Sequence, residues 1–230
     1  MTNLLRTELD AYHIEIVSVD PLDFFGVQAL PPPQVDPEIL DHVEATDMIQ
    51  DRNAELVGLL DLESAVVDFI VELFKVLGYV KRDRLAHTRV DLPLLMCGEY
   101  RYAKTDVCLV DCSQNDILLL VQEDNEAQLV AEAVAAFSQN NQSRRDVGLP
   151  PLDEKIMAGI VMLGTTPTFY KIPVSQSLLY HIRHGTYPPE LTQVTCCAVP
   201  VPRPGEGMKP LDNRKEIFRC YEAFKAIVGI

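Results

Sequence analysis

LPLLMCGEYRYAKTDVCLVDCSQNDILLLVQED, residues 92–124, is the stretch that decides the fold. Gly98 separates two strand-like runs, which indicates a β-hairpin with its turn at that glycine. The tetrad SQND then marks a second turn before ILLLVQED. A continuous apolar run such as ILLLV is typical of a strand covered on both faces. The stretch therefore predicts three consecutive strands.

Helical patterns flank these strands. Residues 61–77 carry apolar side chains at three- and four-residue spacing, with Asp61 expected as the N-cap and Gly78 as the stop. A second helical pattern covers residues 126–140, and a loop, NNQSRRDVGLPP, is expected after it. The order helix, three strands, helix predicts an α/β fold with a mixed central sheet flanked by helices.

The remaining segments add elements at both ends. HIEIVSV reads as a strand, LPPPQVDP as a polyproline-like connector, and residues 37–60 as a ragged amphipathic helix. Three later strands are expected in KIMAGIVMLGTT, TFYKIPV and TQVTCCAVPVP. A short helix in VSQSLLYHIRHG ends at Gly185, and NRKEIFRCYEAFKAI closes the chain as a helix. The 230 residues, 47% of them apolar, fit a single domain spanning residues 1–230.

The formal net charge is −14, which makes generic, electrostatically driven nucleic-acid binding unexpected. Screening confines surface charges to about 10 Å, so a local basic site remains open. KRDRLAHTR, residues 81–89, is the only concentrated basic stretch, and a solvated loop or strand edge is the ordinary role of such a run.

The chain has no apolar run of about 18 residues, so no transmembrane helix is expected. Its first residues, MTNLLRTELDAYHIEI, lack the basic and apolar regions of a secretory signal. A soluble, intracellular protein of the cytoplasm or nucleus is therefore expected. The six cysteines form no CxxC pair and, without a signal, are expected to be reduced and buried.

Two carboxylates could carry chemistry. Asp106 lies within the second hairpin strand, and Glu123 lies at the end of the third. If those strands pair through the SQND turn, the two side chains could approach each other at one sheet edge. Carboxylate oxygens are the ligands that Mg²⁺ prefers, and such a cation can orient water against a phosphodiester. Equally, Asp106 could be an ordinary strand residue, with Glu123 and Asp124 as acids at a helix N-terminus.

The arrangement of Asp106, Glu123 and a helix starting directly afterwards resembles the PD-(D/E)XK nuclease superfamily over residues 61–165. The resemblance implies that Asp106 and Glu123 bind Mg²⁺, with Gln128 in support. An acid on the first helix, Glu63 or Glu72, would complete the site. Residues 1–60 and 166–230 would then be family-specific additions.

This sequence departs from the superfamily at the lysine two positions after the glutamate, where Asn125 stands. Asn carries no positive charge to stabilise a hydroxide or the phosphate. Lys104 could substitute, because residues two apart on a strand share a face, which puts Lys104 beside Asp106. Thr105 replaces the usual proline, a position loosely kept.

More narrowly, the strings LLLVQEDN, AEAVAAFSQNN, MAGIVMLGTTPTFYKIPV and LPPPQVDP resemble a group of uncharacterised fungal proteins, which implies a related fold and no known activity. Two functions stay open. One is a metal-dependent nuclease or its descendant, with nucleic acid at a local site. The other is a non-catalytic module that keeps the nuclease fold and binds protein. A third, an unrelated enzyme using His181 and His184 on one helix face, has no specific support.

Overall fold

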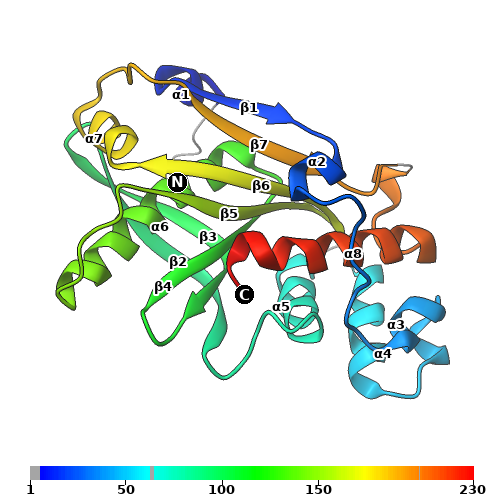
Figure 1. Cartoon of the computed structure of the whole chain (residues 1–230). Helices are drawn as coiled ribbons and strands as arrows, with labels where there is room; N and C mark the ends of the chain where they lie inside the picture. Colours follow the sequence, from blue (N-terminus) through cyan, green and yellow to red (C-terminus); the bar gives the residue numbers. More distant parts are fainter. Residues whose placement is uncertain (1–5, 63–64, 202) are drawn as a thin grey trace.

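The structure is a computed structural model that describes residues 6–62, 65–201 and 203–230. In this part of the chain, seven strands form one mixed sheet (Figure 1). The sheet order is β1-β7-β6-β5-β4-β3-β2. Neighbouring strands are antiparallel, except for the parallel pairs β1–β7 and β4–β5. The strands are β1 Ile14–Ser18, β2 Arg84–Met96, β3 Glu99–Asp111, β4 Asp116–Glu123, β5 Glu154–Leu163, β6 Thr166–Ser175 and β7 Thr192–Ala198.

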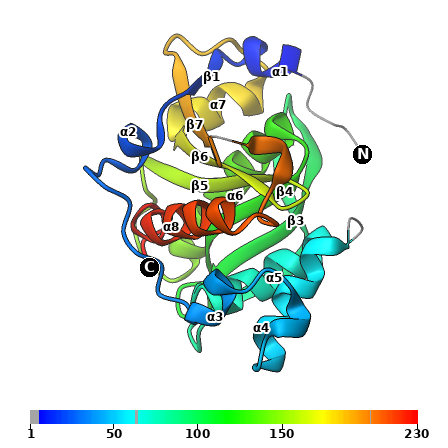
Figure 2. The same ribbon diagram turned by 90° about the vertical axis from the view of Figure 1, so that its right-hand side faces the viewer.

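Helices cover both faces of the sheet, which makes three layers. The α-helices are α1 Arg6–Ala11, α2 Pro21–Phe25, α3 Pro37–Asp41, α4 Asp51–Gly58, α5 Val66–Val76, α6 Glu126–Asp146, α7 Gln176–His184 and α8 Leu211–Val228. Three 3₁₀ turns are η1 Ala45–Asp47, η2 Leu59–Asp61 and η3 Pro204–Glu206. Buried residues of α1, α6 and α7 pack on one face, and those of α2 to α5 and α8 pack on the other. Helices α3, α4 and α5 lie at the end of the molecule away from α1 and α7 (Figure 2).

The apolar run of β4 alternates between the two cores. Leu119 and Val121 pack in the cluster with α5 and α8, whereas Leu120 packs in the cluster with α6. All three side chains are buried, as expected for a central strand flanked by helices on both faces. The α/β prediction with a mixed, helix-flanked sheet is therefore confirmed.

Helix α6 lies unusually close to the sheet at Gly159 of β5. A Cβ at this position would meet the Leu129 side chain of α6 at 2.9 Å, so the absent side chain makes room for the helix. The predicted loop after residue 140 is wrong, because α6 continues to Asp146. The side-chain amide of Asn140 explains the continuation. It accepts from the Ile117 N–H at 2.8 Å and donates to the Ile117 carbonyl at 2.9 Å, which fixes the helix to β4.

Two helix predictions before the hairpin are also corrected. The cap of α5 is Ala65 and its first residue is Val66, so Asp61 is not the N-cap. Asp61 instead ends η2 and forms an ion pair with Lys209 at 2.8 Å. The proposed first-turn residue Glu63 lies outside the described residues.

The ragged helix predicted for residues 37–60 is broken into α3, η1, α4 and η2. The carboxylate of Glu38 is the reason, because it accepts hydrogen bonds from the backbone of Ile49 and Gln50 and from Asn53 Nδ2 at 2.8 Å. These bonds turn the chain back on itself between α3 and α4.

The basic stretch at residues 81–89 is largely strand rather than loop. Arg84 begins β2, the edge strand of the sheet, and β2 pairs with β3 as far as Met96. Charged side chains suit an edge strand, because they discourage further strand pairing.

All six cysteines are free. Cys108, Cys197 and Cys220 are buried as expected, whereas Cys97 and Cys112 are exposed. No helix in the described part of the chain is long and apolar enough to cross a membrane.

Arg214 of α8 is buried, with 1% of its surface exposed. Its guanidinium donates to the carbonyls of Met208 at 3.0 Å, Ile39 at 2.9 Å and His42 at 2.8 Å. One side chain thus joins α8 to the segment before it and to the end of α3. The planar fork of arginine suits several acceptors at once, which a lysine ammonium cannot reproduce.

We expect Arg214→Met to destabilise the protein by about 3 kcal/mol or more, because it leaves several buried carbonyls without a donor. Urea unfolding measures this change. Arg219→Met, at an exposed position of the same helix that holds the carbonyl of Leu30, is the matched control and should cost less. Equal losses in the two variants would contradict the role assigned to Arg214.

Candidate functional site

The candidate site lies where β3 separates from β4. The two strands pair from Asp111–Asp116 to Val107–Val121, while β3 stays paired with β2 beyond this point. The separation leaves backbone groups at the end of β4 without a β3 partner. Polar side chains of β3 are therefore needed there.

Two consecutive side chains of β3, those of Thr105 and Asp106, form hydrogen bonds with the backbone of this part of β4. The Asp106 carboxylate accepts a hydrogen bond from the backbone N–H of Glu123 at 2.9 Å. The buried Thr105 hydroxyl lies 3.0 Å from the Val107 carbonyl and 3.3 Å from the Val121 carbonyl, and its one proton is shared between these two acceptors. Asp106 is thus held against the strand end that carries Glu123, a juxtaposition that depends on the β3–β4 pairing.

The hairpin changes faces at the same place. Ala103 packs in the α6 cluster and Val107 packs in the α5 and α8 cluster, although residues four apart on a regular strand share a face. On β2, Arg89 lies opposite Asp106, between the pairs Thr88–Val107 and Val90–Thr105. Arg89 has a φ of 55°, in the left-handed region that a long side chain rarely adopts. The face change is therefore accompanied by local backbone strain.

The other predicted residues lie on both faces of the sheet, and of these only Glu123 has a hydrogen bond with Asp106 in the described part of the chain. Glu123 and Lys104 are exposed, and strand alternation from Val121 and Ala103 places both on the α5 face of the sheet. Gln128 lies in the first turn of α6 on the opposite face. On the first helix, Glu72 forms an ion pair with Lys75.

Asn125, at the position of the superfamily lysine, is the N-cap of α6. Its side-chain oxygen accepts from the Gln128 N–H at 2.9 Å, the hydrogen bond that begins the helix. The preceding residue, Asp124, has a φ of 51°, and its N–H donates to the Met162 carbonyl at 3.1 Å. The chain thus turns sharply from β4 into α6, and Asn125 has a local structural role at this turn.

Glu132 is a residue of this region that sequence reasoning missed. It is fully buried, its Oε1 accepts from Gln128 Nε2 at 3.2 Å, and its Oε2 has no partner among the described residues. The pKa of Glu132 is raised to about 9, chiefly by burial and to a smaller extent by the charge of Asp106, while hydrogen bonding by Gln128 and Thr105 acts to lower it. The sequence feature that could have revealed this residue is a glutamate inside the otherwise apolar run LVAEAVAAF, residues 129–137.

A buried polar atom without a partner costs about 1–3 kcal/mol, so Glu132 is an expensive residue for a helix core. Burial also raises the pKa of the neighbouring Cys108 thiol to about 12, with a smaller contribution from Glu132. Perturbed ionisable groups gather at functional sites more often than elsewhere. Glu132 therefore marks the surroundings of Asp106 as unusual.

Asp106 and Glu123 fit a Mg²⁺ ion in the kind of donor they offer. One Asp106 oxygen holds the Glu123 N–H, whereas the other oxygen and the Glu123 carboxylate have no hydrogen-bond partner in the described part of the chain. Two carboxylates with water can hold Mg²⁺, which usually keeps several waters. Among the described residues, no group of three or more His, Cys, Asp or Glu is arranged to hold a metal ion.

The histidines of α7 have local partners. His181 Nδ1 lies 2.7 Å from the Thr186 hydroxyl, and His184 Nδ1 lies 2.7 Å from the Tyr180 carbonyl. Both rings lie at the C-terminal end of the helix, where the helix dipole favours them.

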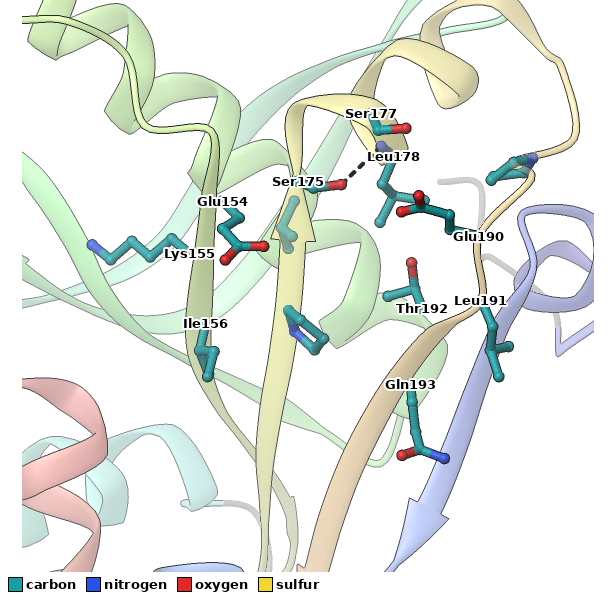
Figure 3. A pocket seen from close by; sticks show the side chains of 13 residues that line it. Glu154, Lys155, Ile156, Ser175, Ser177, Leu178, Glu190, Leu191, Thr192 and Gln193 are labelled. Carbon is teal, nitrogen blue, oxygen red and sulfur yellow. Dashed lines mark hydrogen bonds between the residues drawn. The ribbon is translucent and has the colours of Figure 1, made fainter.

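A cavity of about 450 Å³ lies elsewhere, where β5 begins and β6 ends (Figure 3). Glu154, Lys155, Glu190 and Gln193 are among its polar residues. Ser175 at its edge is engaged as the N-cap of α7, accepting from the Leu178 N–H at 3.1 Å. The β5 end of the cavity is about 20 Å along the strand from Met162, the partner of Glu123. The cavity is therefore separate from the candidate site.

Comparison of the sequence with models of protein families and with curated proteins finds no match.

Glu132 should make stability depend on pH. A carboxyl whose folded-state pKa is raised binds a proton more tightly when folded, so its contribution is complete below the unfolded pKa of about 4.3 and is lost as pH rises toward 9. We expect wild-type stability to fall by up to about 1.4 kcal/mol per pH unit in this window relative to Glu132→Gln. Urea unfolding of both proteins from pH 5.5 to 8.5 measures the difference, and parallel pH profiles would refute it.

Proposed function

We propose that this chain is a PD-(D/E)XK-like protein that binds Mg²⁺ through Asp106 and Glu123 and hydrolyses phosphodiesters. One observation carries the proposal: the Asp106 carboxylate is held on the backbone of Glu123 within the element order α5-β2-β3-β4-α6-β5. In that order the hairpin pairs are antiparallel, β5 returns parallel to β4, and α5 and α6 pack on opposite faces.

The chain's own residues have distinct roles in this proposal. Asp106 and Glu123 would hold the cation, which supplies charge neutralisation at the phosphate. Lys104, exposed on the same face as Glu123, would provide the positive charge that Asn125 lacks. Gln128 would support the site from α6, where its amide already holds Glu132. The proposal also includes membership of the uncharacterised fungal group and a location in the cytoplasm or nucleus.

A second candidate is a non-catalytic module that keeps the nuclease fold and binds another protein. The capping bond of Asn125 favours it, because this residue serves the helix instead of the chemistry. The net charge of −14 also favours it, since it weakens long-range attraction of a polyanionic substrate.

Saturating Mg²⁺ or Mn²⁺ should raise the melting temperature of the wild type by about 5–10 °C, because a ligand that binds only the folded state stabilises it. Asp106→Asn keeps the size of the side chain and removes the charge, so it should abolish the shift. Glu55→Gln, an exposed carboxylate on α4, is the control and should keep it. If neither metal shifts the melting temperature of the wild type, or if Asp106→Asn keeps the full shift, Asp106 and Glu123 are not a cation site.

Asn125→Lys separates the two candidates. We expect it to lower stability by about 1 kcal/mol through loss of the cap and to raise Mn²⁺-dependent cleavage of labelled DNA about 100-fold. Asn125→Ala loses the same cap without adding a charge and should gain no cleavage. Absence of cleavage in the wild type and in Asn125→Lys, at equal folding, would support the binding module.

A further inference from the structure

The outer half of the β2–β3 hairpin presents two exposed tyrosines. Tyr100 is 72% exposed and Tyr102 is 68% exposed. They share one face of β3 with Lys104, because alternate residues of a strand point the same way. The β2 partners on that face are Leu95 for Tyr100, Pro93 for Tyr102 and Asp91 for Lys104. This row is the outward side of the hairpin, since Leu92, Leu94 and Ala103 take the other side, against α6.

Positive charge is concentrated in residues 81–104, whereas the whole hairpin, residues 84–111, has four Lys or Arg and four Asp or Glu. Residues 81–104 contain six Lys or Arg and three Asp or Glu, a net charge of +3. The rest of the chain therefore carries −17, since the total is −14. Residues 81–104 thus differ in charge from the rest of this acidic chain, and screening allows their positive side chains to act within about 8–10 Å.

Arg89 connects this row to the candidate site. It is exposed, lies opposite Asp106, and forms no ion pair in the described part of the chain. By contrast, Arg101 on the other face of β3 is paired with Glu99 at 2.9 Å. A strained residue that keeps its charge uncompensated beside Asp106 is suited to holding a phosphate.

We propose that the hairpin face, formed by Arg89, Pro93, Leu95, Tyr100, Tyr102 and Lys104, binds single-stranded nucleic acid. The inference rests on the proposed function and names its substrate class. Bases stack on Tyr100 and Tyr102, and Arg89 and Lys104 contact the phosphates next to Asp106. A single strand fits this face better than a duplex, because the bases of a duplex are stacked on each other and cannot reach the tyrosine rings.

The test is fluorescence anisotropy of a labelled 20-nucleotide oligothymidylate in EDTA, so that binding does not depend on the cation site. The wild type should bind, with an affinity that falls as salt rises. Tyr100→Ala with Tyr102→Ala should weaken binding about tenfold or more. Arg89→Asn with Lys104→Gln should reduce the slope of log affinity against log salt by about 1.4, which is about 0.7 per phosphate contact.

Matched controls separate position from composition. Arg101→Gln removes the same charge from the other face, and Tyr180→Ala removes a tyrosine that is 57% exposed on α7. Both should bind like the wild type. Asn tolerates the left-handed conformation of residue 89 better than Arg does, so Arg89→Asn keeps the backbone and removes only the guanidinium.

The inference is overturned if the oligonucleotide does not bind, if the control variants weaken binding as much as the hairpin-face variants, or if a duplex or polyglutamate competes as well as the single strand. These results are independent of the metal shift. Loss of the metal shift with intact strand binding refutes the cation site alone, whereas an intact shift without strand binding refutes the hairpin face alone.

Discussion

The candidate site depends on how the backbone N–H and C=O groups at the end of β4 find hydrogen-bond partners beyond the point where β3 separates from β4. Asp106 and Thr105 supply an acceptor and a donor to the backbone of β4, so the strand continues to Glu123 without its neighbour. β4 ends there, and two residues later Asn125 caps α6, which begins at Glu126. The same two side chains therefore set the geometry of the sheet and of the candidate site.

Several unfavourable features gather around this point. Arg89 has a left-handed backbone, and Glu132 has a buried oxygen without a partner in the described residues. Each costs free energy that a purely structural hairpin and helix would not need to spend, since Gly or Asn suits the first position and Ala or Leu suits the second. Such features persist where surrounding packing holds them and are concentrated at functional sites.

The Asn125 cap and the overall charge both weigh against cleavage. Asn125 serves the helix and an acidic surface repels phosphate at a distance, which favours binding without cleavage. In the proposed hairpin face, Arg89 and Lys104 would counter that repulsion at short range, because screening limits the reach of the distant acids.

The sequence by itself determined the elements whose signals are local. The apolar run of β4, the turn at Gly98 and the end of α7 at Gly185 follow from short-range pattern and backbone preference. It also placed Asp106 within one strand and Glu123 at the end of the next, although it did not establish their contact. Tertiary structure decided the start of α5, where Asp61 ends η2 instead of capping the helix, and the length of α6, which Asn140 fastens to the backbone of Ile117. It alone brought Arg89 and Glu132 to Asp106, since strand register and helix packing join residues that no local pattern relates.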